Sequence, residues 1–224
     1  MKQNKYIIIV AGGRGTRMGG DTPKQFLPLA GSIVLMHTLN RMSAAEPHAT
    51  LILALPHDQQ EEWKRLCKQY DYTQPHHIVD GGETRFHTVN NALQLVPDGA
   101  WVAIHDGVRP LVSIDVVRNA FVTAAKYGSA IPVMPVVESL RRIDQNNSYA
   151  VERSAYRAVQ TPQVFDSTLL KAAYSLPYRS EFTDDASVYE AAGHRITLVD
   201  GNSENIKITI RQDIVLAEYL LYNI

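Results

Sequence analysis

Short apolar runs alternate with longer amphipathic segments along most of this chain. The runs at residues 7–10, 50–55, 101–105, 129–135 and 196–199 predict β-strands, the first of them buried on both faces. Apolar residues at helical spacing predict helices at residues 33–44, 58–70, 84–95, 114–127, 167–176, 184–192 and 212–222. This alternation predicts the α/β class: a three-layer, mostly parallel, Rossmann-like twisted sheet with helices on both faces.

One segment, residues 136–157, departs from this alternation. It has two extended, charged pieces on either side of the turn-forming stretch 145–148. So many polar residues do not fit a core. The segment is either an exposed excursion or a protruding β-arm that packs on another subunit, and we expect the arm. With no linker or repeat elsewhere, residues 1–224 are expected to form one domain.

Composition narrows the function classes. The 224 residues carry a formal net charge of −1, so nothing favours a nucleic-acid partner or a charged membrane surface. Cys67 is the only cysteine, which excludes an internal disulfide and suits a reducing compartment. Lys2 and Lys5 precede an apolar run far too short for a membrane span. We therefore expect a soluble, cytoplasmic protein that binds neither nucleic acid nor membranes.

A glycine-rich loop follows the first apolar run. The glycines within residues 12–15 have no Cβ, so their backbone N–H groups can approach a ligand closely. Three cations, Arg14, Arg17 and Lys24, follow within the same loop. Backbone donors and cations together make an anion site, and a loop at the carboxyl end of a central strand is where open α/β sheets bind ligands. The pattern predicts a polyphosphate site.

Two other phosphate-binding loops do not fit this spacing. A Walker A loop needs Gly-Lys followed by Ser or Thr, which occurs nowhere in the chain. A dinucleotide-binding fingerprint has Met18 at its third glycine position and lacks the acidic residue that binds the ribose. A nicotinamide-dependent oxidoreductase is therefore disfavoured.

Several strings then point to a family. The opening string, AGGRGTRM at 11–18 with PKQF at 23–26, resembles the sugar-phosphate nucleotidyltransferases, and among them the 2-C-methyl-D-erythritol 4-phosphate cytidylyltransferases. The likeness continues through DGGETR at 80–85, HDGVRP at 105–110, QTPQ at 160–163, TDDAS at 183–187 and NIK at 205–207. The strings follow one another in order over nearly the whole chain, which makes the set far more specific than any one of them.

The resemblance implies a reaction. Such an enzyme transfers a cytidylyl group from CTP to 2-C-methyl-D-erythritol 4-phosphate, giving 4-diphosphocytidyl-2-C-methyl-D-erythritol and pyrophosphate in non-mevalonate isoprenoid precursor biosynthesis. It also implies a homodimer whose arm lies near the partner's active site. A ribitol-5-phosphate cytidylyltransferase is an alternative, because those sister enzymes also have a bulky residue at the position of Val108. A non-catalytic nucleotide-binding module is another, although it would be expected to lack Arg17, Lys24 or Asp106.

The reaction itself makes demands that these residues meet. A phosphate monoester with a second pKa of about 6 is already mostly dianionic near neutral pH, so it needs little help from a general base. Catalysis then depends on positioning and on cations. Arg17 and Lys24 are the candidate transition-state stabilisers, and the family resemblance gives them the same role. Asp106, at the end of a predicted strand, is the candidate ligand for Mg²⁺, and Ser113 is better placed to cap the next helix.

The remaining candidates divide into two sets. The glycine loop and the Gly-Gly-Glu turn, where backbone can approach a flat base, supply the nucleotide-binding set: Ala11, Gly12, Gly13, Gly15, Thr16, Gly81, Gly82, Glu83, Arg85 and Thr88. Cytosine as that base, and most of the acceptor set, come from the resemblance. The acceptor set is Arg109, Ser139, Arg153, Thr161, Thr183 and Lys207. Arg109 could instead pair with Asp106, and His105 is expected to orient the Asp106 loop.

Overall fold

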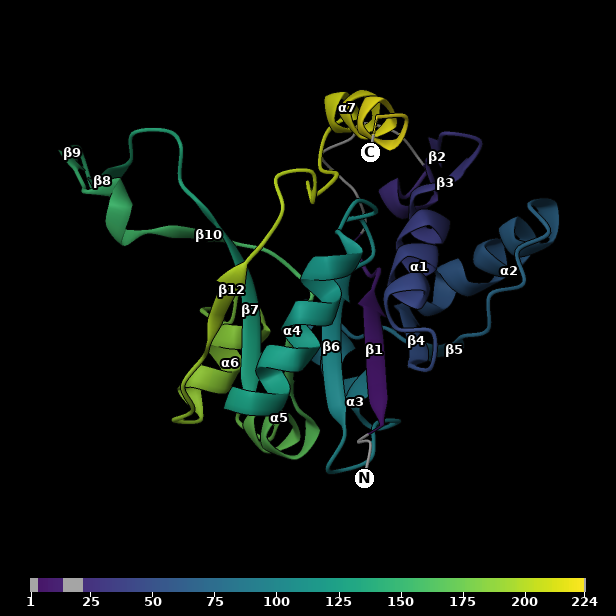
Figure 1. The fold of residues 1–224 in the computed structure, drawn as a ribbon, viewed down its shortest axis with the longest axis horizontal. Coiled ribbons are helices and arrows are strands. Elements are labelled where there is room, and N and C mark those ends of the chain that lie inside the picture. Colours follow the sequence, from purple (N-terminus) through teal and green to yellow (C-terminus); the bar gives the residue numbers. More distant parts are fainter. Residues whose placement is uncertain (1–3, 14–21, 224) are drawn as a thin grey trace.

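A twisted sheet forms the middle layer of the molecule (Figure 1). The computed structural model describes residues 4–13 and 22–223. Within these residues the sheet has eight strands, in the order β10-β7-β11-β6-β1-β4-β5, with β12 also paired to β7. The strands are β1 (Lys5–Val10), β4 (Thr50–Leu55), β5 (His77–Asp80), β6 (Trp101–Asp106), β7 (Ser129–Pro135), β10 (Arg157–Val159), β11 (Gln163–Asp166) and β12 (Leu198–Asp200).

The sheet is mostly parallel, as the sequence predicted. Strand β1 pairs in parallel with both β4 and β6, β4 with β5, and β12 with β7. The exceptions are β10 and β11, which run antiparallel to their neighbours. Strand β11 lies between β6 and β7 and joins the two parts of the sheet.

Helices cover both faces of the sheet, which confirms the three-layer prediction (Figure 1). Side chains alternate across a strand, so Ile7 and Ile9 of β1 face one side and Ile8 the other. The first side packs against α1 (Val34–Ala45), α2 (Gln60–Gln69) and α4 (Ile114–Tyr127). The second packs against α3 (Arg85–Leu93), α5 (Ser167–Tyr174) and α6 (Asp185–Ala191). The two apolar clusters stabilise the strands that carry the site.

Each predicted helix is present, with its ends within two residues of those expected. Helix α4 begins at its cap as predicted, because the Ser113 hydroxyl accepts from Val116 N at 3.1 Å. Three short strands of the central sheet were missed, namely β5, β10 and β11. Strand β12 begins two residues later and ends one residue later than predicted. Runs of three or four residues give too few positions for a period to be recognised.

A smaller apolar cluster connects the carboxyl-terminal helix to the rest of the molecule. Helix α7 (Arg211–Leu221) buries Ala217 against a layer that includes Leu29, Val34, Val108 and Leu111. Leu29 belongs to a two-stranded hairpin of β2 (Pro28–Leu29) and β3 (Ser32–Ile33). The short 3₁₀ helix η2 (Lys24–Phe26) comes just before this hairpin, and η3 (His57–Gln59) precedes α2.

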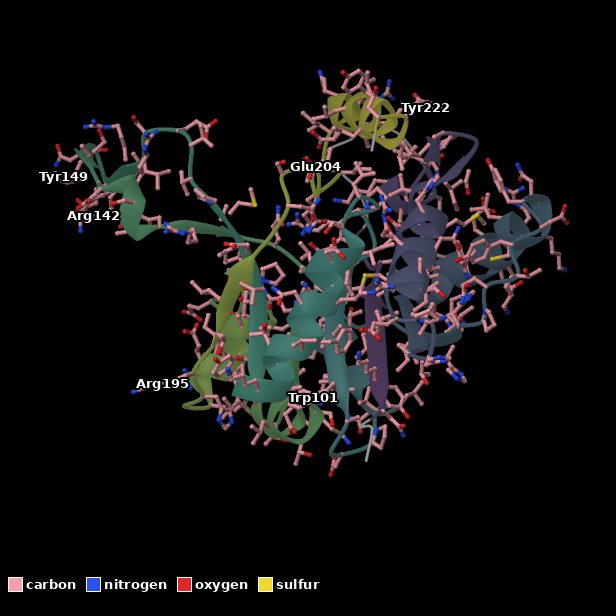
Figure 2. All side chains as sticks on the ribbon, in the orientation of Figure 1. Trp101, Arg142, Tyr149, Arg195, Glu204 and Tyr222 are labelled. Atoms are coloured by element: carbon pink, nitrogen blue, oxygen red, sulfur yellow. The ribbon has the colours of Figure 1, made fainter. Side chains whose placement is uncertain are left out.

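The predicted arm projects away from the sheet (Figure 1). Strand β7 ends at Pro135 and β10 begins at Arg157, and these two residues pair with each other. Between them, β8 (Arg141–Asp144) and β9 (Asn147–Ala150) form an exposed hairpin, followed by the 3₁₀ helix η4 (Arg153–Ala155). Figure 2 shows Arg142 and Tyr149 at its tip, where the guanidinium lies 5.4 Å from the ring centroid.

No helix in the described part of the chain combines the length and the apolar character that crossing a membrane requires.

Candidate active site

The carboxyl ends of the central strands meet at one edge of the sheet, and the predicted loops meet there too. Val10 is the register partner of Asp106, so the glycine loop and the aspartate leave neighbouring strands side by side. Gly107 N donates to Val10 O at 2.9 Å and Ala11 N to Ala54 O at 3.0 Å, which fixes both loops at their first residues. The edge therefore joins segments that lie nearly one hundred residues apart in the chain.

These loops enclose a first cavity. It is lined by Val10, Ala11, Gly12, Gly13, Lys24, Gln25, Gly82, Glu83, Thr84, Arg85, Thr88, Asp106, Val108 and Lys207. Most of the predicted nucleotide-binding residues that the structure describes are thus in one place, together with Lys24 and Asp106. Gly81 lies beside the lining, where its N–H donates to Leu55 O at 2.7 Å. Gly15, Thr16 and Arg17 lie outside the described residues.

Lys24 reaches this cavity from a firmly held segment. Its neighbours Gln25 and Phe26 are buried, and Phe26 stacks on Trp63 with 6.2 Å between ring centroids. The Gln25 amide donates to Ala11 O at 2.8 Å and to Gln59 Oε1 at 2.7 Å. Gln25 therefore ties the lysine segment to the first residue of the glycine loop.

The turn at residues 81–83 is held by Thr88. The Thr88 hydroxyl accepts from Gly82 N at 3.0 Å and donates to Thr84 O at 2.9 Å. A Cβ on Gly82 would lie 2.4 Å from His87 Cβ, so only glycine fits there. The Thr88 hydroxyl thus stabilises the turn through both hydrogen bonds. Its predicted contact with a nucleotide stays a prediction.

Asp106 is buried among three cations. Its Oδ2 lies 3.0 Å from Lys207 Nζ and 3.2 Å from Arg109 Nε, and its Oδ1 lies 3.7 Å from Arg85 Nε. Burial by itself raises the pKa of this carboxyl, but the charges of Arg85, Lys207 and Arg109 outweigh it and hold the pKa well below its usual range. Asp106 is therefore ionised at neutral pH.

A chain of hydrogen bonds under Asp106 fixes its backbone. Asp106 N donates to the Thr161 hydroxyl at 3.1 Å, and that hydroxyl lies 3.0 Å from His105 Nδ1. His105 Nε2 lies 3.1 Å from Arg109 O, an acceptor, so the ring proton is on Nε2 and Nδ1 accepts from Thr161. Burial lowers the pKa of His105 to about 4, which keeps the ring neutral. These contacts agree with the expected role of His105 in orienting the loop.

A second cavity adjoins the first. It is lined by Arg85, Asp106, Arg109, Val159, Gln160, Thr161, Gln163, Thr183, Asp184 and Lys207. Arg85, Asp106 and Lys207 line both cavities and so lie at the boundary between them. Four of the six predicted acceptor residues lie here: Arg109, Thr161, Thr183 and Lys207. Thr183 does not cap α6, because Asp184 takes that position.

The other two acceptor candidates do not reach this cavity within the chain. Ser139 and Arg153 are both exposed on the arm, and Arg153 Nη1 donates to Val137 O. Neither residue lines either cavity. Their predicted contact with an acceptor stays a prediction.

Some residues of the site were missed as functional candidates. Asn205 Nδ2 donates to Thr161 O at 2.8 Å, and Asn205 O accepts from Arg109 Nη1 at 2.7 Å. Asp185 binds both outer nitrogens of Arg85. Gln25, Asn205 and Asp185 all lie inside the strings that carried the family resemblance, which was the only signal for them.

Comparison with known proteins agrees with this geometry. Residues 6–223 match the family model of 2-C-methyl-D-erythritol 4-phosphate cytidylyltransferase. A protein of that name from Porphyromonas gingivalis is 52% identical over 223 residues, covering 99% of each chain. Another, from Bacteroides thetaiotaomicron, is 49% identical over 221 residues, which is 99% of this chain and 100% of the relative.

Solved structures show the same fold. The crystal structure of 2-C-methyl-D-erythritol 4-phosphate cytidylyltransferase from Thermus thermophilus is 30% identical, with a TM-score of 0.76 over 99% of this chain and 100% of the other. The 4-diphosphocytidyl-2C-methyl-D-erythritol synthase from Anaerococcus prevotii reaches a TM-score of 0.82 at 26% identity, over 98% and 99% of the two chains. This chain belongs to the 2-C-methyl-D-erythritol 4-phosphate cytidylyltransferase family.

Proposed function

We propose that this chain transfers the cytidylyl group of CTP to 2-C-methyl-D-erythritol 4-phosphate. The products are 4-diphosphocytidyl-2-C-methyl-D-erythritol and pyrophosphate, in non-mevalonate isoprenoid precursor biosynthesis. The family match over residues 6–223 favours this acceptor over ribitol 5-phosphate. The observation that carries the proposal is the pair of adjoining cavities that share Arg85, Asp106 and Lys207, because one site must hold two phosphorylated substrates at once.

The first cavity is the proposed CTP site. Its backbone donors near Gly12 and Gly13 and its cation Lys24 suit a triphosphate, and the narrow turn at Gly82 suits a flat base. Arg17, outside the described residues, is proposed to act with Lys24 on the charge that develops in the transition state. A non-catalytic nucleotide-binding module would not need Lys24 and Asp106 to line the same cavity.

The second cavity is the proposed acceptor site. The phosphate oxygen of the acceptor attacks the α-phosphorus of CTP, and the bond from that phosphorus to the β-phosphate oxygen breaks as pyrophosphate leaves. Lys207 and Arg109 would hold the attacking phosphate, with Thr183 at the cavity wall. Because two polyanions must meet, positioning and positive charge supply most of the catalysis.

Asp106 is the proposed ligand for Mg²⁺. Its Oδ1 faces Arg85 Nε at 3.7 Å, beyond hydrogen-bond distance, so this oxygen suits a cation. In the described residues no three His, Cys, Asp or Glu side chains gather in a metal-binding group. A single carboxylate fits Mg²⁺, which completes its shell with phosphate oxygens and water. When bound, the ion would neutralise and orient the triphosphate.

The arm is the proposed contact with a second copy of the chain. Ser139 and Arg153 are exposed and line neither cavity of their own chain. A homodimer in which each arm reaches the partner's acceptor cavity would supply both residues there. A cytoplasmic location also remains a proposal, based on the single cysteine.

Pyrophosphate release tests the proposed reaction. Purified protein with CTP, Mg²⁺ and 2-C-methyl-D-erythritol 4-phosphate is expected to release pyrophosphate, and ribitol 5-phosphate is expected to support it poorly. The reverse preference would identify the ribitol enzyme. No release with either acceptor, from protein that still binds CTP, would point to a binding module.

A further inference from the structure

Arg85 lies at the boundary between the two cavities, and a second carboxylate holds its guanidinium there. Arg85 Nη1 donates to Asp185 Oδ1 at 2.9 Å and Nη2 to Asp185 Oδ2 at 2.6 Å. Tyr174 donates its hydroxyl to the same Oδ1 at 2.6 Å. Asp185 is fully buried and lines neither cavity. Both oxygens of the Asp185 carboxylate therefore accept hydrogen bonds from Arg85 or Tyr174.

Asp185 is itself fixed by the elements around it. It is the first residue of α6, directly after the cap formed by Asp184 and Ser187. The Gln163 side chain of β11 donates to Asp184 Oδ2 at 2.7 Å and accepts from Ala186 N at 2.9 Å. A central strand thus sets the position of Asp185 from both sides, and Asp185 in turn sets that of Arg85.

Among the described residues, Asp106 is the other carboxylate within ion-pair distance of Arg85. Arg85 already has its Nε 3.7 Å from Asp106 Oδ1. A guanidinium prefers a bidentate pair with a carboxylate, and Arg85, which is only partly exposed, is expected to seek another carboxylate when it loses its partner. Oδ2 of Asp106 already pairs with Lys207 and Arg109. A guanidinium of Arg85 that turned toward Asp106 would therefore also occupy Oδ1.

We propose that Asp185, supported by Tyr174, is a positioning residue that keeps the two outer nitrogens of Arg85 away from Asp106. Arg85 then presents its charge to both cavities while Oδ1 of Asp106 stays open to a divalent cation. This inference rests on the proposed role of Asp106 as the cation ligand. Asp185 acts only through Arg85 and touches no reacting group.

The test replaces the charge of Asp185 while keeping its shape. In Asp185→Asn the Arg85 guanidinium is expected to turn toward Asp106 and occupy its Oδ1. The Mg²⁺ concentration that gives half the maximal rate should then rise about tenfold or more, and kcat should fall about 10- to 100-fold. Mn²⁺ binding in the presence of CTP, followed by water-proton relaxation, should weaken by a similar factor without any need for turnover. Asp185→Glu keeps the negative charge and should therefore restore most of the activity and most of the Mn²⁺ affinity.

Glu190→Gln is the matched control, because it makes the same chemical change on the exposed side of α6. Tyr174→Phe keeps the ring stacked on Phe86, with centroids 4.7 Å apart, and removes one hydrogen bond. It should raise the Mg²⁺ requirement about threefold to tenfold, in line with one lost hydrogen bond. If Asp185→Asn does not fold, Tyr174→Phe still tests whether the hydrogen bonds of Asp185 control the Mg²⁺ requirement.

The outcomes separate this inference from the proposed function. If Asp185→Asn lowers the melting temperature but leaves the Mg²⁺ requirement and Mn²⁺ binding unchanged, the residue is only structural and the inference is wrong. If the wild type binds Mn²⁺ with CTP but transfers nothing, the proposed function fails, and the relaxation measurement still tests Asp185. If Asp106→Asn leaves Mn²⁺ binding intact, the cation lies elsewhere and the inference fails with it.

Discussion

Asp106 is surrounded by more positive charge than it can neutralise. Arg85, Arg109 and Lys207 together bring three charges to one carboxylate, and Asp185 balances one of them. The cluster keeps a net positive charge next to the cavity where phosphates are expected. At the scale of single residues, this excess charge is the feature that best suits the boundary between two polyanionic substrates.

Val108 raised a question of specificity, because the ribitol sister enzymes also have a bulky residue there. Val108 lines the first cavity and not the second. Its side chain also packs in the apolar cluster that contains Ala217 of α7. Its bulk therefore acts beside the proposed CTP site. It gives no reason to prefer ribitol 5-phosphate as the acceptor.

Lys24→Ala tests the proposed catalytic cation. If Lys24 acts mainly in the transition state, kcat should fall several hundred-fold while the Kd for CTP changes by less than about tenfold. Turnover is measured by pyrophosphate release and CTP affinity by calorimetry. Lys64→Ala is the control, since Lys64 is exposed on α2 and, among the described residues, its ion-pair partner is the exposed Glu61. A large loss of affinity with unchanged kcat would contradict the assigned role.

At the scale of elements, the contact between α2 and the segment before β5 depends on a neutral histidine. Trp63 Nε1 can only donate, so His76 Nε2, 2.9 Å away, must accept. The ring proton is then on Nδ1, which donates to Gln74 O at 2.7 Å. Burial lowers the pKa of His76 below its ordinary value of 6.5, because a charged ring would lose its hydration.

This arrangement predicts a pH dependence of stability. The unfolded chain binds a proton at His76 near pH 6.5 and the folded chain only at lower pH, so stability is lost as pH falls from about 6.5 to the folded pKa. In His76→Gln, melting temperatures between pH 8 and 5 should fall less steeply than in the wild type. His48→Gln, at an exposed site, should leave the slope unchanged. Equal slopes for His76→Gln and wild type would refute this assignment.

At the scale of the whole molecule, the arm and the cavities belong to different parts of the chain. Two-fold symmetry would let each arm complete the partner's acceptor site. A mixture of Lys24→Ala and Arg153→Ala chains would then contain mixed dimers with one intact site each. Random exchange should recover activity to about a quarter of the wild type, although each variant alone is nearly inactive.

The control for this mixing experiment is Lys24→Ala with Asp106→Asn. Both changes damage the site of the chain that carries them, so no mixed dimer has an intact site and activity should not return. Pyrophosphate release after co-refolding measures both mixtures. If the Arg153 mixture recovers no more activity than the control, Arg153 acts in the site of its own chain and the shared arrangement is ruled out.

Several helices and strands of this fold could be predicted from local sequence patterns. The run at residues 7–10 is long enough and apolar enough to specify a buried strand. The anion loop expected from the glycines and cations after it stays a prediction. Helix α4 has both its apolar face and its Ser113 cap within consecutive residues. Such features depend on residues within a few positions of one another, so the sequence by itself determined them.

Tertiary structure decided what depends on distant partners. Strand β11 gains its place only by pairing antiparallel with β6 and β7, a choice that four residues cannot encode alone. Thr161 was predicted to bind the acceptor substrate; it lines the second cavity, and its hydroxyl also accepts a hydrogen bond from Asp106 N, 55 residues away in the sequence. Arg85 and Asp185 are 100 residues apart in sequence, and the packing of α3 against α5, and of α5 against α6, brings them together as a pair. Bonds between distant residues follow from packing, which no local pattern contains.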